Sequence, residues 1–406
     1  MPPLRVDAST LDRDQFKVVE EADECLVIPR KDKFAWRDDE LHLRSLVLDR
    51  DGYVRSAGFP KFFNLGERPA LDRALAAAMA RGAVEFPEKL DGSLIVADRV
   101  LGAPRLRSRG LRTLGEFEPE VQGLIAAAYP QLLAFLRDDP LLDAHSLLFE
   151  FVSPARTIVL RPEREALFLL GYVDKGRVAP AWDAPTLDRV SAATGVPVAP
   201  LHPLPADLEG ALAQVRAWKG REGVVARFLD EDGAPRLIKI KAADYLRLHA
   251  YRTRLAGARA LKIAWLLDLE DEHMLLPSLA RYGLDWEAAE FARADVAPYL
   301  VRRRAATARF EAFAAQLGPW AGARDKREKR AYVDRVRAML ASTDAFGDEW
   351  WFTVAMRYFD ADADDARLVV DAAVLGEAPT TLRAWRKDVD AEIRAILTAP
   401  VRDEDG

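Results

Sequence analysis

Short apolar runs, separated by Gly, Pro and Asp, dominate the first 250 residues of the chain. Runs of this length, rich in β-branched and aromatic residues and bounded by turn residues, predict β-strands. The expected strands cover residues 41–48, 94–97, 147–152, 167–173, 224–229 and 237–240. We expect them to pair mainly in an antiparallel manner.

Two segments between these runs predict helices. Residues 68–82 read RPALDRALAAAMARG, with a proline at the start, a glycine at the end and apolar residues at helical spacing. Residues 120–136 show a similar pattern that Pro130 interrupts. Strands and helices mixed in this way indicate an α+β domain.

The pattern changes near residue 250. Beyond it the chain is rich in Ala, Leu and Arg and shows the 3.6-residue period of helices, most clearly over residues 288–317 and 327–343. We therefore expect an α+β, antiparallel-sheet domain over residues 1–250 and an all-helical C-terminal domain over residues 251–406.

Length and composition fit this division. A chain of 406 residues exceeds what one hydrophobic core usually supports, and 50% hydrophobic with 31% charged residues is ordinary for a soluble globular protein. No apolar run approaches the ~18 to 20 residues of a membrane span. One cysteine, Cys25, excludes an internal disulfide. We expect a cytoplasmic protein without a membrane partner.

Net charge constrains the partners only weakly. The formal charge of -6 argues against a protein that coats nucleic acid indiscriminately, although a local basic groove could still bind a polyanion.

Lys89 is the first candidate for chemistry. It lies in EFPEKLDGSLIV, residues 85–96, just before the turn formed by Asp91 and Gly92. A Lys-x-Asp-Gly pattern alone is weak evidence, because a chain of this length contains it by chance about one time in ten. The pattern therefore needs support from other segments.

Three later segments place charges on expected strands. Glu150 lies in LLFEFV, Glu222 in REGVVARF, and Lys239 and Lys241 alternate with isoleucines in LIKIK. The two lysines should project from one face of their strand, about 7 Å apart. Each charge alone also fits a solvent-exposed face, since lysines commonly protect strand edges.

As an ordered set, these segments resemble the motifs of the covalent nucleotidyltransferase superfamily, which includes nucleic-acid ligases and capping enzymes. Lys89 in KLDGS resembles the nucleophile motif, and Glu150, Glu222 and the Lys239–Lys241 pair resemble three later motifs. Arg109 in SRG stands where related ligases often have lysine.

Two upstream segments are similar to the RNA ligase 1 family, whose phage-type members seal breaks in RNA. They are LRSLVLD, with Arg44, and GFPKFFNLGE, with Lys61. The KFFN piece is distinctive, because DNA ligases and capping enzymes lack it. The resemblance covers roughly residues 40–275.

The resemblance implies a three-step reaction. Lys89 takes AMP from ATP, the AMP passes to an RNA 5′-phosphate, and a 3′-hydroxyl then attacks to form the phosphodiester. It implies ATP and Mg²⁺ or Mn²⁺ as cofactors and an RNA substrate, single-stranded or a nicked tRNA, in RNA or tRNA repair.

The resemblance also implies roles for individual residues. Lys239 and Lys241 should lie at the α-phosphate of ATP, and Glu150 should accept a hydrogen bond from a ribose hydroxyl. Asp91 and Glu222 should position Lys89 and a magnesium ion. Arg44, Lys61 and Arg109 are further nucleotide-binding candidates. Asp271 and Glu272, in DLEDEH, are metal candidates, although a solvated helix end is the plainer interpretation.

The chemistry explains why cations are needed. The attacking amine must be neutral, whereas a lysine with an unperturbed pKa near 10.4 is only about 0.04% neutral at pH 7. We expect Lys239, Lys241 and a magnesium ion to disfavour the ammonium form of Lys89. The same cations would neutralise the triphosphate and the charge that develops on phosphorus.

Two other functions remain open. A capping-type guanylyltransferase or a DNA ligase would use the same lysine, but both ordinarily have a β-rich domain after the motif that the Lys239–Lys241 pair resembles, whereas this chain continues in helices. A catalytically silent RNA-binding relative would usually have lost one of the site residues. In the helical part, Arg302 to Arg304 and Lys326 to Arg330 are candidates for phosphate contacts, with solvated helix faces as the alternative.

Overall fold

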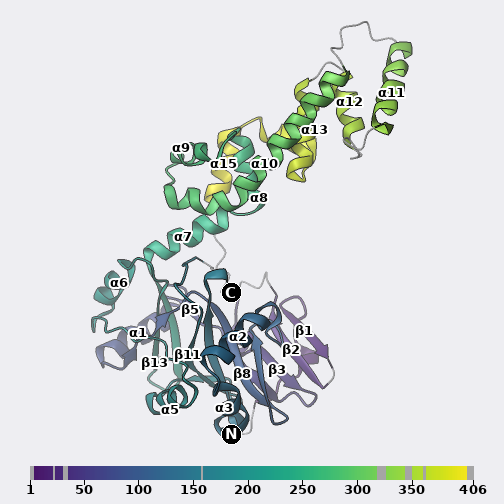
Figure 1. Cartoon of the computed structure of the whole chain (residues 1–406). Coiled ribbons are helices and arrows are strands. Elements are labelled where there is room, and N and C mark those ends of the chain that lie inside the picture. Colours follow the sequence, from purple (N-terminus) through teal and green to yellow (C-terminus); the bar gives the residue numbers. More distant parts are fainter. Residues whose placement is uncertain are drawn as a thin grey trace. The chain divides into compact units, whose positions relative to one another are not determined.

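The structure, a computed structural model, describes residues 4–21, 23–30, 35–156, 159–317, 326–342, 350–359 and 363–399. The chain divides into two compact units between Arg247 and Leu248. Strands occupy the purple-to-teal part of the chain and helices its green-to-yellow part (Figure 1). The protein is thus α+β, with antiparallel sheets followed by a helical region, as the sequence predicted.

The described residues of the first unit form three sheets. The first has the order β1 (Phe16–Glu21), β2 (Glu24–Pro29), β3 (Leu46–Asp49) and β4 (Val54–Ala57). The second has the order β12 (Ala179–Ala181), β11 (Ala166–Asp174), β10 (His145–Val152), β8 (Ser93–Val100) and β9 (Ala103–Ser108). All of these pairs are antiparallel.

The third sheet has the order β5 (Phe63–Asn64), β14 (Pro235–Lys241), β13 (Gly223–Leu229) and β6 (Val84–Glu85), and β7 (Glu88–Lys89) also pairs with β13. Here β5 runs parallel to β14, while β6, β7 and β14 are antiparallel to β13.

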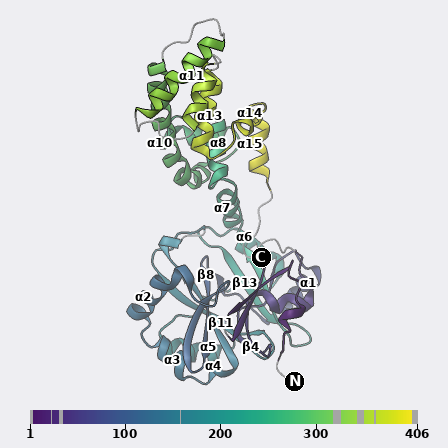
Figure 2. The ribbon, with the colours of Figure 1, turned by 90° about the vertical axis from the view of Figure 1, so that its right-hand side faces the viewer.

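The second sheet is buried on both faces. On β8, Ile95 and Ala97 belong to a core shared with helices, whereas Val96 faces the core that includes β3 and β4. The period-2 alternation of a strand explains this division. The helical side is covered by α2 (Glu118–Ala128), α3 (Leu132–Asp138) and α5 (Ala184–Thr194), visible beside the strands in Figure 2.

The third sheet packs against α1 (Pro69–Ala80) and α6 (Leu208–Arg216) through a separate core that includes Leu75, Val215 and Phe228. A short helix, α4 (Leu141–Ala144), precedes β10. The expected helices are confirmed: α1 begins at Pro69, and Pro130 separates α2 from α3.

Five of the expected strands are confirmed with small changes at their ends, but the expected strand over residues 41–48 is partly wrong. Residues up to Arg44 belong to the 3₁₀-helix η2 (Asp38–Arg44), and only β3 follows. The acidic residues Asp38, Asp39 and Glu40 occupy the first turn of η2, where negative charge is favoured. The sequence also missed β1 and β2, whose charged ends weaken the apolar pattern.

Helices make up the rest of the described chain. They are α7 (Ala243–Arg254), which contains the division between the units, α8 (Ala258–Leu266), α9 (Leu275–Ala280), α10 (Trp286–Leu317), α11 (Lys326–Ala341), α12 (Trp350–Phe359), α13 (Ala363–Leu375), α14 (Pro379–Trp385) and α15 (Val389–Thr398). In the described part of the second unit, one core lies around Trp265 and Tyr299 and another around Phe313 and Trp351. Among the described residues, no helix has both the length and the apolar character of a membrane span.

Candidate active site

Strand β14 is the centre of the candidate site. It lies between β5 and β13, so it is an inner strand and not the exposed edge that two lysines would otherwise suggest. Lys239 and Lys241 are both buried. Because the two residues alternate along the strand, their ammonium groups leave the same face of the sheet. Burying two cations is costly unless negative charge compensates them, which points to a site for an anion.

Lys89 and Lys241 share one carboxylate. Lys89 Nζ lies 2.7 Å from Glu222 Oε1, and Lys241 Nζ lies 3.6 Å from the same oxygen. The side chains are 14% exposed for Lys89, 4% for Lys241 and 2% for Glu222. Lys89 is therefore held inside the protein beside the strand with the paired lysines, as the sequence interpretation requires.

The sequence did not predict the electrostatic effect of Glu222 on the amine of Lys89. The sequence suggested that cations around Lys89 would favour its neutral form. A carboxylate at 2.7 Å acts in the opposite direction and favours the ammonium form. The amine of Lys89 therefore has an attractive partner, Glu222, and a repulsive neighbour, Lys241.

Backbone pairing places Lys89. Its strand, β7, pairs with β13 so that Lys89 lies opposite Gly223, the residue after Glu222. On both sides the main chain is fixed, because Val225 donates to the carbonyl of Pro87 at 3.0 Å and Glu88 donates to that of Pro200 at 2.7 Å. The position of the amine is therefore set by the sheet and not by a mobile loop.

Glu150 lies beside the turn that follows Lys89. It pairs with Leu94 on β8, at the start of the strand after the turn. A side chain on Gly92 would come within 3.0 Å of Glu150 Cγ and 2.3 Å of the carbonyl oxygen of Phe151. Glycine is thus needed at position 92 because the turn packs directly on β10.

Asp91 ties this turn to two other segments. One carboxylate oxygen accepts the backbone N–H groups of Val159 and Leu160, both at 2.7 Å, and the other accepts the hydroxyl of Tyr245 at 2.9 Å. The ring of Tyr245 lies 5.5 Å from Lys241 Nζ. Tyr245 therefore links the turn after Lys89 to the strand of the paired lysines.

The KFFN segment lies directly against β14. Asn64 on β5 pairs with Lys239, and the N–H of Leu65 donates to the Lys239 carbonyl at 2.9 Å. The ring of Phe62 lies 5.1 Å from Lys239 Nζ and 5.5 Å from the guanidinium carbon of Arg44. Both cations lie within the range of a cation–π interaction with one ring.

Lys61 and Arg109 lie on the segments beside this ring. Lys61 Nζ is 5.7 Å from the ring of Phe63 and 5.9 Å from that of Trp36. Arg109 follows β9, and its carbonyl accepts the hydroxyl of Ser45 at 2.7 Å. Ser45 immediately follows Arg44, so the segments of two predicted nucleotide-binding arginines are hydrogen-bonded to each other.

Asp271 and Glu272 belong to the second unit, whereas the other predicted site residues belong to the first. Asp271 caps the 3₁₀-turn η5 (Glu272–Met274) by accepting the N–H of His273 at 2.9 Å. Among the described residues, no group of three or more His, Cys, Asp or Glu side chains is placed to hold a metal ion. A metal role for these two acids stays a prediction.

Sequence reasoning missed three side chains around the site: Phe62, Arg107 and Tyr245. Phe62 and Tyr245 lie within quoted motifs, but aromatic residues next to lysines carry no signal until the strands are paired. Arg107, in LRSRG, resembles any exposed strand residue in the sequence, although it is fully buried.

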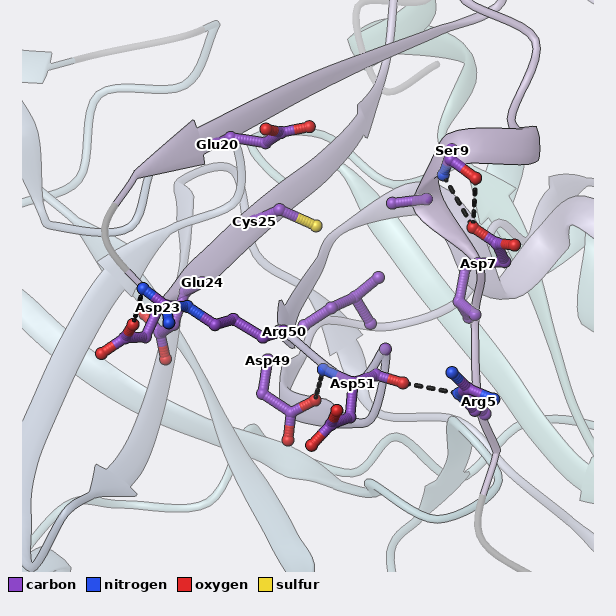
Figure 3. Close-up of a pocket in the computed structure, with 14 residues that line it drawn as sticks. Arg5, Asp7, Ser9, Glu20, Asp23, Glu24, Cys25, Asp49, Arg50 and Asp51 are labelled. Atoms are coloured by element: carbon purple, nitrogen blue, oxygen red, sulfur yellow. Dashed lines mark hydrogen bonds and ion pairs between the residues drawn. The ribbon is translucent and has the colours of Figure 1, made fainter.

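A separate cavity lies between the N-terminal segment and β2 and β3, with a volume of about 420 Å³. Figure 3 shows that acids line it, and two of them are engaged within the protein: Asp7 accepts from Ser9, and Asp23 pairs with Arg50 at 2.5 Å. None of the predicted site residues lines this cavity.

No family model and no curated protein matches the chain. Several solved structures are similar. An archaeal ATP-dependent RNA ligase is 17% identical, with 73% of this chain and 76% of that chain covered and a TM-score of 0.41. A putative ATP-dependent DNA ligase from Aquifex aeolicus is 15% identical, with coverages of 60% and 62% and a TM-score of 0.38.

A Naegleria gruberi RNA ligase mutant with ATP and Mn is 16% identical, covers 47% of this chain and 61% of that chain, and has a TM-score of 0.31. At these identities and TM-scores, the similarity assigns no family and no activity to the chain. The interpretation of the site therefore depends on its own geometry.

Proposed function

We propose that this protein is an ATP-dependent RNA ligase that joins a 5′-phosphate to a 3′-hydroxyl through a lysyl-AMP intermediate on Lys89. The observation that carries the proposal is the shared contact of Lys89 and Lys241 with Glu222, on strands that bury Lys239 as well. Few structural roles require two lysines at one interior carboxylate and a third buried lysine on the same strand, because each buried charge costs free energy.

The residues of the site fit ATP. Lys239, Lys241 and Arg44 supply positive charge from two segments, and charge-assisted hydrogen bonds to phosphate oxygens are stronger than neutral ones. Glu150, beside the turn, offers a carboxylate that can accept from a ribose hydroxyl. Lys61 and Arg109 lie on adjoining segments and would contact the outer phosphates.

The first step follows from this arrangement. Lys89 Nζ, after losing a proton, forms a bond to the α-phosphorus. The bond from that phosphorus to the bridging oxygen breaks, and pyrophosphate leaves with the electron pair. Glu222 orients the amine, while Lys241 and Lys239 stabilise the charge that develops on the phosphoryl oxygens.

A divalent ion, Mg²⁺ or Mn²⁺, would neutralise the phosphates when bound. Mg²⁺ commonly binds one or two carboxylates together with substrate phosphates. Glu222 is suited to such a contact, and Asp271 and Glu272 are the more distant candidates in the sequence. In this proposal Asp91 acts on the shape of the turn through its three hydrogen bonds.

The second and third steps transfer AMP to the RNA 5′-phosphate and then expel it as the 3′-hydroxyl attacks. We assign RNA and not DNA because KFFN, which DNA ligases and capping enzymes lack, is built into the site next to Lys239. A break in tRNA or in a similar RNA, repaired in the cytoplasm, is the substrate that this assignment favours.

Incubation of the full chain with ATP or GTP labelled at the α-phosphate, in the presence of magnesium, tests the proposal. We expect label from ATP to remain on the protein in a denaturing gel and to disappear in Lys89→Ala. As a matched control, Lys219→Ala removes an exposed lysine from the same unit and should leave labelling unchanged.

Other outcomes would point elsewhere. Label from GTP alone would indicate a capping-type guanylyltransferase, and no label from either nucleotide would indicate a silent RNA-binding relative. With label from ATP established, sealing of nicked DNA in preference to nicked RNA would favour a DNA ligase.

A further inference from the structure

Arg107 is a fully buried arginine with an unusual number of partners. Its Nε donates to Ser56 Oγ at 2.6 Å and its Nη1 to Ser45 Oγ at 2.8 Å. The guanidinium also donates to the carbonyls of Ser45 at 3.2 Å and Ser108 at 3.1 Å. It is 0% exposed, so all of these bonds form in the interior.

Ser45 and Ser56 each connect Arg107 to a further group through their hydroxyls. A guanidinium can only donate hydrogen bonds, so each serine oxygen must accept from Arg107 and direct its own proton elsewhere. Ser56 donates to the buried carboxylate of Asp98, and Ser45 donates to the carbonyl of Arg109 at 2.7 Å. The direction of every bond in this network is therefore fixed.

Asp98 supplies the negative charge of this network, which also includes a second cation, Lys175. Asp98 also accepts from Ser146 at 2.5 Å, and Lys175 Nζ lies 3.6 Å from it. Burial lowers the pKa of Arg107 to about 10, which is still well above neutral pH. Arg107 thus remains charged and can act as a donor at every nitrogen under ordinary conditions.

The network fixes three segments that carry candidate nucleotide-binding cations. Ser45 follows Arg44, and its carbonyl also accepts the N–H of Gly58 at 2.9 Å, at the start of the segment with Lys61. The third segment is held through the carbonyl of Ser108, which accepts from Arg107, and that of Arg109, which accepts from Ser45. One guanidinium therefore joins the main chains beside Arg44, Lys61 and Arg109.

We propose that Arg107 is a positioning residue for ATP binding: it sets the relative places of Arg44 and Arg109 without touching the nucleotide. This inference rests on the proposed function, because it assumes that these two arginines contact ATP. Lysine cannot replace Arg107, since a single ammonium cannot reach both serines and the carbonyls in the geometry of a planar fork.

Equilibrium binding of ATP to the full-length protein tests the proposal. Calorimetric titrations are made in a Lys89→Ala background, so that no covalent transfer interferes. The variants are Arg107→Lys, which keeps the charge, and Ser45→Ala, which removes the hydroxyl between Arg107 and Arg109. Arg105→Gln is the matched control, because Arg105 lies on the same strand, is partly buried and pairs instead with Glu24 at 2.7 Å.

We expect the Kd for ATP to rise about tenfold in Arg107→Lys and in Ser45→Ala, and to rise little further when both are combined, because the two changes break one shared contact. Arg105→Gln should leave the Kd unchanged even where it lowers the thermal transition. An unchanged Kd in folded Arg107→Lys, or an equal rise in Arg105→Gln, would overturn the proposal.

Failure of the proposed function gives a different result. If Arg107→Lys weakens ATP binding while the protein with Lys89 intact takes no label from ATP, the positioning role is supported and the ligase is rejected. An absence of ATP binding in every form would reject both.

Discussion

At the scale of single residues, the balance of charge around Lys89 defines the site. Glu222 contacts both Lys89 and Lys241, so two ammonium groups share one carboxylate in the interior. The net positive charge that remains would be neutralised by a bound polyphosphate. Removing a buried member of such a group is expected to cost more than removing an exposed lysine.

Lys241→Met tests this balance. Methionine keeps most of the volume but removes the cation that should stabilise the charge on phosphorus, and loss of one such donor typically slows a reaction by about 100-fold. We therefore expect single-turnover transfer of AMP to Lys89 to slow by about that factor, measured at saturating ATP. Lys219→Met, an exposed lysine, should not change the rate; equal rates in both variants would contradict the role of Lys241.

At the scale of elements, the pairing of β13 with β14 and β7 brings the site residues together. Gly223 lies opposite both Lys241 and Lys89. Its φ of +147° and the carbonyl of Ile240, 2.0 Å from where a Cβ would lie, leave no room for a side chain. A glycine at this point allows three strands to approach within the site.

Gly223→Ala should therefore weaken both the fold and the site. Backbone strain alone costs about 1–3 kcal/mol, and the contact with β14 adds to it. We expect a lower midpoint of thermal unfolding for the first unit and loss of labelling at Lys89. Gly123→Ala in helix α2 should instead stabilise the fold. A Cβ at position 123 would meet nothing within 4 Å, and alanine adds about 1 kcal/mol of helix propensity. A Gly223→Ala protein as stable and as active as wild type would show that the close contact is not required.

At the scale of the whole molecule, the chain consists of two units with cores of their own. The first unit contains the candidate site and the buried network of Arg107, while the second is helical. Arg303, one of the basic residues considered for phosphate contacts, is buried there and pairs with Asp268 at 2.5 Å. It therefore belongs to the interior of the helical unit, and the sequence interpretation of it as a surface cation was wrong.

Separate cores predict two unfolding transitions in calorimetry. ATP at 100 times its Kd should raise only the transition of the first unit, by about 2.7 kcal/mol of stability. Trp351→Ala should lower only the other transition, and Phe149→Ala only the first, because each truncation of a buried aromatic residue costs about 3–5 kcal/mol. A single transition that all three changes move together would contradict this independence.

The sequence by itself determined the fold class, the change to helices near residue 250 and the order of the motif residues. It could do so because strand and helix periods and turn residues are local properties of the chain. It also placed Lys239 and Lys241 on one face, since alternation on a strand does not depend on neighbours.

Only the tertiary structure decided that β14 is an inner strand, that Glu222 contacts both lysines and that Arg107 is buried among serines. Whether a strand is inner or edge depends on which distant segments pair with it, and a buried arginine and an exposed one have the same letter in the sequence. The partners of a charge are set by long-range packing, and so the electrostatic character of the site became visible only when the strands were assembled.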